Sequence, residues 1–363
     1  MTRTFWVLAV LGFAICAVVV IPGLRAGEVS GEAGYRVLEP VKHGNLTIFP
    51  VVSTTSHDTH QFLTLDEGLR SGEVVVTEAG NVSPLVRPRH GQQVWQERRG
   101  GGAEVNRLVL VNNSRRPLLL LAGEIVTGGK QDRIIGKDRL VPAESDPIDL
   151  GVFCVEPGRW VGTSGKFAAP SVIVQPSVRA KAMGAKDQQQ VWDEVGKTRT
   201  AMAETVTVEA APRVAQTSSY AGVIENRAVR EKVESVAAPV EHEYQSVIRQ
   251  LRNKNAVGVV VAVNGEIIWA DVFASSSLLE KYWPKLVRSY AAESVVQRVK
   301  AGSVDLKAAQ QFLDRLHGRR EVVENEPGLF RHAEITGDGY RVFELTSLLP
   351  NTGFDLHVAK MAE

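Results

Sequence analysis

The side chains best suited to chemistry lie in residues 118–160. Glu124 interrupts an apolar run at residues 118–126, and an unpaired carboxylate inside a buried strand is costly. A cation should therefore meet it. Lys130 and Arg133 follow after two glycines, which can turn the chain back because glycine adopts positive φ readily. The sequence predicts an ion pair between Glu124 and Arg133 or Lys130.

A second group of polar residues follows a second apolar run at residues 150–155. Glu156 ends that run, and a Pro-Gly pair typical of a type II turn then presents Arg159 and Trp160. The two groups together define one face as the candidate ligand-binding site. The candidate residues are Glu124, Lys130, Gln131, Arg133, Glu156, Arg159 and Trp160.

Three interpretations fit these residues. In the favoured functional one, the face binds a small anionic ligand, nucleotide- or sugar-like, or a protein of the cell envelope, because cations hold anions. In the alternative, the protein is a hydrolase of such an anionic substrate, with Glu124 and Glu156 as acid and base. In the third, the charges form a structural network that locks two strands together. The sequence leaves open whether the protein is an enzyme, and no catalytic residue is assigned.

Cys154 and two histidines could have more specific chemical roles, but the sequence supports these roles less well. Cys154 could be a nucleophile beside a cation, but its apolar strand neighbours favour a buried, unreactive thiol. His57 and His60 have a spacing seen among metal ligands, yet a solvated surface loop explains them more simply. Motifs for serine hydrolases, phosphate loops and dinucleotide binding are missing from the sequence. We therefore expect no cofactor and no metal.

The balance of charge limits the classes of partner that the protein could bind. Lys and Arg number 42 and Asp and Glu 41, which gives a formal net charge of +1. Such balance argues against a nucleic-acid-binding surface. Residues 84–102 are rich in arginine and glycine and form either an anion-binding loop or, as composition favours, a solvated connector.

The amino-terminal segment predicts export. Arg3 precedes an apolar stretch at residues 5–21, so residues 1–26 are a signal peptide or an uncleaved signal anchor. The remaining chain would lie outside the cytoplasm, in the periplasm or beyond. It would be either secreted or anchored by residues 5–24, which would be its only contact with the membrane.

The order of elements predicts an α+β fold. After a tether at residues 27–45, we expect a single α+β domain at residues 46–363, with an antiparallel or mixed sheet and hairpins packed against several helices. Asn264 and Gly265 separate two apolar runs, which is typical of a type I′ hairpin. Asp271, in the second of these runs, is expected to face solvent. One helix is expected at residues 177–203.

Three motifs carry a resemblance to a known family. The segments LLLAGEIVTGGKQDRII, VPAES and CVEPGRW, with further matches across residues 46–300, resemble a bacterial family named for its association with ADP-ribosylglycohydrolases and the rhodanese-phosphatase superfamily. This resemblance implies an association with ADP-ribose chemistry but no reaction. Asp132 and Pro157 depart from the family pattern. The residues that match its charged motif are Glu124, Gly128, Gly129, Lys130, Gln131, Arg133, Glu156, Arg159 and Trp160.

Overall fold

The computed structural model describes residues 34–79, 103–162, 164–249 and 255–363. All of them belong to one compact unit, residues 31–363. The predicted signal segment (residues 1–26) and the arginine-rich segment (84–102) lie outside the described residues. Among the described helices, none is long and apolar enough to cross a membrane.

The expected α+β class with antiparallel sheets is confirmed, and one sheet dominates the fold. Nine strands form it in the order β1-β3-β12-β13-β17-β16-β15-β14, with β2 paired to β3, and every pairing is antiparallel. Its strands are β1 (Tyr35–Val37), β2 (Val41–His43), β3 (Leu46–Ser53), β12 (Asn255–Val263), β13 (Glu266–Phe273), β14 (Arg319–Glu326), β15 (Phe330–Gly337), β16 (Tyr340–Ser347) and β17 (Asp355–Ala362).

Two smaller sheets contain the stretch that holds the candidate site. Five strands pair in the order β5-β6-β11-β9-β8, and three in the order β10-β7-β4, where only the β4–β7 pairing is parallel. Their strands are β4 (Leu63–Thr64), β5 (Val74–Glu78), β6 (Arg107–Asn112), β7 (Leu118–Leu120), β8 (Ile125–Val126), β9 (Arg133–Ile135), β10 (Arg139–Val141) and β11 (Ile148–Cys154).

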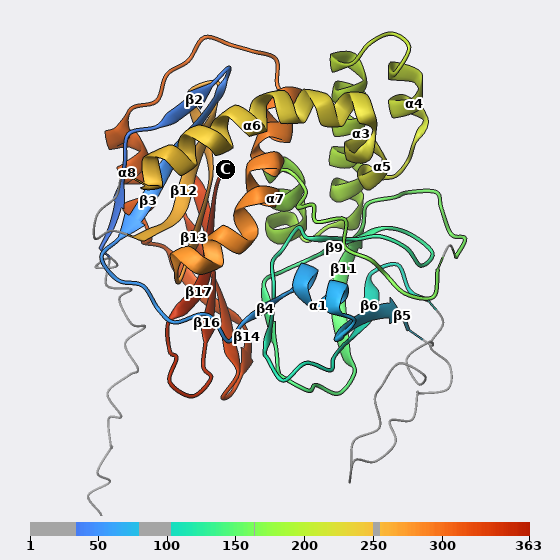
Figure 1. Ribbon diagram of the computed structural model, residues 1–363, viewed down its shortest axis with the longest axis vertical. Coiled ribbons are helices and arrows are strands. Elements are labelled where there is room, and N and C mark those ends of the chain that lie inside the picture. Colours follow the sequence, from blue (N-terminus) through green and yellow to red (C-terminus); the bar gives the residue numbers. More distant parts are fainter. Residues whose placement is uncertain (1–33, 80–102, 163, 250–254) are drawn as a thin grey trace, which may run out of the picture. The chain divides into compact units, whose positions relative to one another are not determined.

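Helices cover the large sheet and link it to the smaller ones. The long helices α6 and α7 lie side by side and pack on β2, β3, β12 and β13 (Figure 1). The helical elements are α1 (Leu65–Ser71), α2 (Pro176–Ala180), a π-helix (Lys181–Ala185), α3 (Gln188–Thr205), α4 (Ala211–Gln216), α5 (Tyr220–Glu225), α6 (Arg227–Arg249), α7 (Ser276–Val296) and α8 (Leu306–Asp314).

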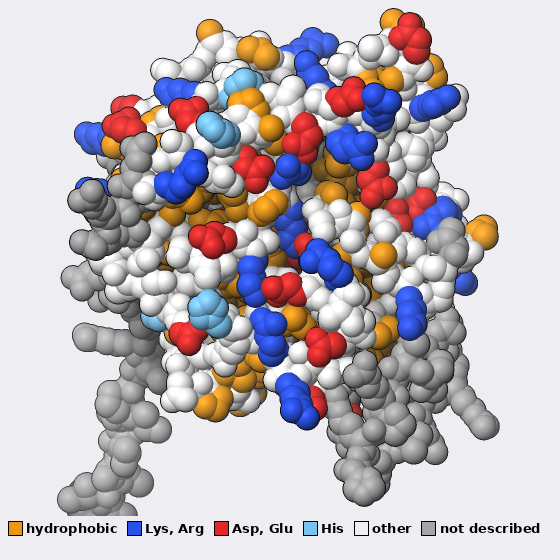
Figure 2. All heavy atoms as spheres, viewed as in Figure 1, with side chains coloured by type: hydrophobic (Ala, Val, Ile, Leu, Met, Phe, Trp, Pro, Cys, Tyr) orange, Lys and Arg blue, Asp and Glu red, His pale blue; other side chains and the backbone are white. Residues whose placement is uncertain are grey.

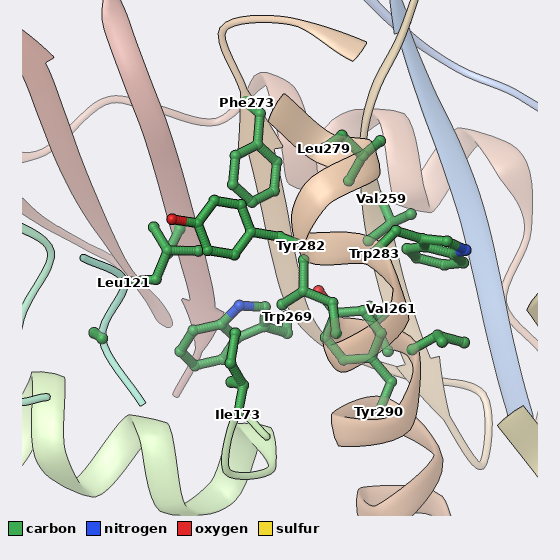
Figure 3. Packing of buried hydrophobic residues seen from close by; sticks show 14 of the residues in the cluster. Leu121, Ile173, Val259, Val261, Trp269, Phe273, Leu279, Tyr282, Trp283 and Tyr290 are labelled. Atoms are coloured by element: carbon green, nitrogen blue, oxygen red, sulfur yellow. The ribbon is translucent and has the colours of Figure 1, made fainter. Parts of the chain in front are cut away.

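The main core lies between α7 and the large sheet. Leu279, Tyr282 and Trp283 recur at helical spacing along α7 and face valines of β12 and aromatic residues of β13 (Figure 3). Tyr282 stacks on Phe273 with ring centroids 5.4 Å apart, and Trp283 stacks on Tyr244 of α6 at 4.1 Å. Offset ring pairs of this kind add roughly 0.5–1.5 kcal/mol beyond the burial of their area. This core fixes α7 and every polar side chain that the helix carries.

The predicted hairpin at residues 264–265 is confirmed. β12 and β13 pair antiparallel on either side of Asn264 and Gly265, whose φ angles are 55° and 79°. Both central residues therefore have the positive φ that a type I′ turn requires.

Several predicted elements were wrong in extent. Residues 35–43, predicted as part of a tether, form β1 and β2. The apolar run at 118–126 is two strands, β7 and β8, because the chain turns at Gly123, whose φ is 88°. The helix expected at 177–203 is α2, a π-helix and α3, separated where Lys186 adopts a left-handed conformation. Apolar periodicity does not reveal such interruptions.

Candidate functional site

Six of the seven candidate residues gather at one end of the β9–β11 ladder. Arg133 pairs with Cys154 across that ladder. This register brings the residues before β9, Lys130 and Gln131, next to the residues after β11. The latter are Glu156, Arg159 and Trp160. The structure thus confirms that the two charged motifs meet.

Glu156 and Arg159 close the loop that follows β11. Arg159 Nη2 lies 2.6 Å from Glu156 Oε2 and 3.3 Å from Asp132 Oδ1. The backbone amide of Asp132 donates to Glu156 Oε2 at 3.0 Å, and Ser219 Oγ donates to Asp132 Oδ2 at 2.7 Å. Gln131 Nε2 donates to the Glu156 carbonyl. These contacts give Glu156 and Arg159 a structural part in holding the loop.

Among the described residues, Arg133 has no comparable counterion. Its side chain is 0% exposed, Nε donates to the Val105 carbonyl at 2.7 Å, and Nη2 reaches the Glu104 carbonyl at 3.5 Å. Within the described part of the chain, Nη1 has no hydrogen-bond partner and no carboxylate forms an ion pair with the guanidinium. Burial lowers the pKa of Arg133. Glu78, whose Oε1 accepts from the Lys130 amide at 2.8 Å, also has a buried oxygen, Oε2, without a described partner.

Trp160 covers this region with an indole that remains 42% exposed. The Lys130 ammonium lies 4.9 Å from its ring centroid and the Arg133 guanidinium carbon 5.9 Å. Neighbouring Val161 is 70% exposed. We call Lys130, Arg133 and Trp160 the Trp160 face: an accessible aromatic ring flanked by two cations.

Glu124 belongs to a different cluster, so its predicted ion pair with Arg133 or Lys130 is wrong. The carboxylate binds the ammonium of Lys285 on α7, which also lies 3.1 Å from Asp66 Oδ2. The other carboxylate oxygen of Glu124 accepts a hydrogen bond from the Leu121 amide at 2.7 Å. Burial raises the pKa of Glu124, and Lys285 acts against that rise.

The sequence carried a signal for Lys285 that the prediction missed. Lys285 lies on the apolar stripe of α7 with Leu278, Tyr282 and Ser289, all of which are buried. A lysine on such a stripe needs a carboxylate partner. Its partner Glu124 is 161 residues away, which explains why local spacing pointed to the wrong cation.

Lys285 and Arg288 line a cavity of about 480 Å³ between α5, α6, α7 and residues 170–173. Charges of both signs line it, with Glu225 and Glu234 beside Arg230, Lys285 and Arg288. Arg288 binds both carboxylate oxygens of Glu234, at 2.5 and 3.1 Å. Lys285 binds Glu124 and Asp66. Figure 2 likewise shows acidic and basic side chains interspersed over the face that carries α6 and α7. This cavity therefore gives no strong preference for a charged ligand.

Asp271, predicted to face solvent, is fully buried in a second charge network, so that prediction was wrong. Arg179 donates to both of its oxygens, at 2.8 and 3.0 Å, and Tyr290 Oη donates to it as well. His357 Nε2 lies 3.0 Å from Asp271, and its Nδ1 lies 2.5 Å from Asp138. Burial alone would lower the pKa of His357, but the carboxylates of Asp138 and Asp271 raise it to about 9.

Cys154 is buried, as predicted. It is 0% exposed, and burial raises the pKa of its thiol although Arg133 lies opposite it. A raised pKa keeps the thiol protonated at neutral pH, and the thiolate is the reactive form. Among the described histidines, cysteines and acids, no group of three or more is arranged to hold a metal ion. His57 instead stacks on Phe354 at 4.0 Å.

Comparison with known proteins identifies the family. Neither the curated proteins nor the solved structures gave a match. A family model, the ARG and Rhodanese-Phosphatase-superfamily-associated Protein domain, matches residues 34–357. That range extends beyond residues 46–300, where the sequence motifs had placed the resemblance, and it includes both charge networks and the Trp160 face. The chain therefore belongs to the ARG and Rhodanese-Phosphatase-superfamily-associated Protein domain family.

Proposed function

We propose that this domain binds a small anionic ligand at the Trp160 face and performs no chemistry on it. The observation that carries the proposal is Arg133. Its guanidinium is fully buried and forms no ion pair among the described residues, and Nη1 lacks a hydrogen-bond partner there. A buried charge without an ion pair is destabilising, and an anionic ligand held beside Lys130 and the Trp160 ring would reduce that penalty by attraction at short range, without touching the guanidinium.

The surrounding residues favour a ligand that combines an anionic group with a flat ring. Lys130 supplies a second cation beside Arg133, and the exposed face of Trp160 can stack with a ring. Stacking of a base or similar ring on an aromatic side chain contributes roughly 1–3 kcal/mol. A nucleotide-like or sugar-acid ligand has both features, whereas a simple inorganic anion would use only the cations.

The positions of the two acidic candidates favour binding over hydrolysis. Glu124 is occupied by Lys285 and the Leu121 amide, and Glu156 by Arg159 and the Asp132 amide. An acid–base pair must reach one substrate from two sides. Since each carboxylate is bound to its own structural partners, this geometry supports a binding role.

The proposed setting is extracytoplasmic, where the partner would be such a ligand or an envelope protein. This part of the proposal rests on Arg3 and the apolar stretch at residues 5–21. Alkaline phosphatase folds only after export, so a fusion to the carboxyl terminus should be active. A green fluorescent protein fusion that is bright inside the cell, paired with an inactive phosphatase fusion, would contradict export.

Titration of the purified full chain with AMP tests the binding proposal. AMP should quench tryptophan fluorescence and protect it from iodide, while adenosine and phosphate alone should bind more weakly. Trp160→Ala and Lys130→Ala should each weaken AMP binding about tenfold, the loss expected for one stacking or charged contact. The control is Lys232→Ala, because Lys232 is a surface lysine that lies on α6. If AMP, ADP-ribose and pyrophosphate all fail to bind, or if both variants bind normally, the proposal is wrong.

A further inference from the structure

A separate cavity of about 440 Å³ lies between the large sheet and the strand β11. One wall is the end of the large sheet, with Val323, His332 and Phe343 from three neighbouring strands. The opposite wall includes Phe153 of β11 and Met183 of the π-helix. Small-molecule sites commonly have this size and apolar lining, with a few polar groups that fix orientation.

His332 is a buried polar residue of this cavity whose side chain lacks partners among the described residues. It is 1% exposed, and neither Nδ1 nor Nε2 has a hydrogen-bond partner in the described part of the chain. His357 gives a direct contrast, because it lies in the same row of residues across the sheet. His332 pairs with Leu345, and Leu345 pairs with His357. The two histidines thus share one face of the sheet. His357 has both nitrogens bound by carboxylates, whereas His332 has neither.

The protonation of His332 limits what it can recognise. Burial lowers its pKa, so the imidazole is neutral near pH 7. A neutral imidazole carries one N–H donor and one acceptor nitrogen. A ligand group that is both donor and acceptor, such as an amide or a hydroxyl, matches it.

Two backbone features also shape the cavity for a ligand. Ala182 and Met183 come from the π-helix, a rare element that often occurs at functional sites. Gly151 of β11 leaves open space where another residue would place its Cβ, since no atom lies within 4 Å of that position. A side chain at residue 151 would occupy the cavity.

The charged residues at the cavity form pairs that cancel. Lys186 Nζ lies 2.7 Å from Glu334 Oε1, and Lys137 binds Glu324. With both cations matched by carboxylates, an ionic ligand gains no net attraction. The aromatic rings of Phe153 and Phe343 favour a flat apolar ligand.

We propose that this cavity binds a small, uncharged aromatic molecule whose donor–acceptor group faces His332. The site is independent of the Trp160 face. None of the residues of the Trp160 face, Lys130, Arg133 and Trp160, lines this cavity. The two sites can therefore be tested separately.

Benzamide is the probe, and benzoate and toluene are the comparison ligands. The affinity of the full chain for each is measured by titration calorimetry. Benzamide should bind at least about tenfold more tightly than toluene, which lacks the polar group, and than benzoate, which carries a charge. His332→Leu should weaken benzamide binding about tenfold. The same variant should keep or raise the unfolding temperature, because it removes two unpartnered buried nitrogens. If His332 only stabilised the fold, its replacement would lower benzamide affinity and the unfolding temperature together.

Gly151→Val provides an independent test that leaves His332 in place. Valine suits a strand and should abolish benzamide binding by filling the cavity. Gly165→Val is the matched control, because Gly165 also has open space around its Cβ position and is not part of the cavity lining. The proposal is overturned if benzamide binds no better than toluene or benzoate, or if its affinity survives either His332→Leu or Gly151→Val.

Discussion

Arg133 and Arg179 are both 0% exposed, yet their surroundings differ. Arg179 donates two hydrogen bonds to Asp271 and lies 4.5 Å from the ring centroid of Trp269. Arg133 has backbone carbonyls and the edge of the Trp160 face, and no carboxylate of the described residues forms an ion pair with it. One nitrogen of each guanidinium, Nη1 of Arg133 and Nε of Arg179, has no hydrogen-bond partner among these residues, so the contrast lies in the ion pair. Asp271 neutralises Arg179 through an ion pair, whereas within the described part of the chain Arg133 has none, although the negative charges of Glu78 and Asp132 favour its charged form.

The difference separates structural charges from charges available for binding. A buried ion pair holds elements in place, and removing one partner is strongly destabilising. A buried polar group with unmade hydrogen bonds weakens the fold, and a functional site is one reason why natural proteins keep such a group. The Arg179 network joins α2, α7, β13 and β17, whereas Arg133 lies beneath an exposed indole.

Asp271→Asn should give the largest loss of stability. The substitution keeps the shape of the side chain but removes the charge that Arg179 and His357 both face. Leaving a buried cation uncompensated costs about 3–5 kcal/mol, measured by denaturant unfolding. Asp149→Asn is the control, because Asp149 is exposed and lies 3.5 Å from Arg107, and an exposed pair contributes only about 0–1 kcal/mol. Equal effects at the two positions would refute the structural role of the network.

The Glu124–Lys285 pair should show strong coupling in a double-mutant cycle. Lys285→Met alone leaves Glu124 buried without its cation and should cost about 3 kcal/mol. Adding Glu124→Gln should recover part of that loss, with a coupling energy of about 1–3 kcal/mol. The comparison cycle pairs Glu124→Gln with Arg133→Met, which should be additive within about 0.5 kcal/mol. Coupling in the second cycle and not the first would restore the ion pair expected from the sequence.

His357 should make stability fall at alkaline pH. Its pKa is about 9 in the folded protein, against an ordinary value of 6.5, so the folded state binds the proton more tightly. The resulting stabilisation, on the order of 3 kcal/mol, is fully present below pH 6.5 and is lost as the pH rises through 9.

The effect of His357 is measured as a difference between wild type and His357→Gln. Other titrating groups also make stability depend on pH. Burial lowers the pKa of Lys360 to about 7, which makes stability rise with pH over part of this range. Unfolding free energies of both proteins at several pH values between 6 and 10 give the difference curve. That curve should decline with rising pH, and a flat curve would show that His357 is not held as a cation.

The sequence predicted local features better than distant contacts. The I′ hairpin at Asn264 and Gly265 follows from two residues whose φ preferences are strong, and the buried Cys154 follows from its apolar neighbours. Six candidate residues also came together, because the two motifs flank β9 and β11, which pair directly. Each of these predictions depends on short segments of chain.

The failures involve partners that only tertiary structure brings together. Asp271 was expected in solvent because one face of a strand usually is, but Arg179 and His357 come from α2 and from the last strand. Glu124 was assigned to a nearby cation, although Lys285 is 161 residues away. A charge inside an apolar run shows that a partner exists, but it does not show which of many cations fills that place.

One substitution made at both arginines tests the central comparison most directly. Arg179→Met and Arg133→Met each replace a fully buried guanidinium with an apolar side chain of similar length. Arg179→Met should cost about 3–5 kcal/mol of unfolding free energy and leave AMP affinity unchanged in the folded fraction. Arg133→Met should cost no more than about 1 kcal/mol and abolish AMP binding. Equal losses of stability, with AMP binding retained by Arg133→Met, would contradict the account.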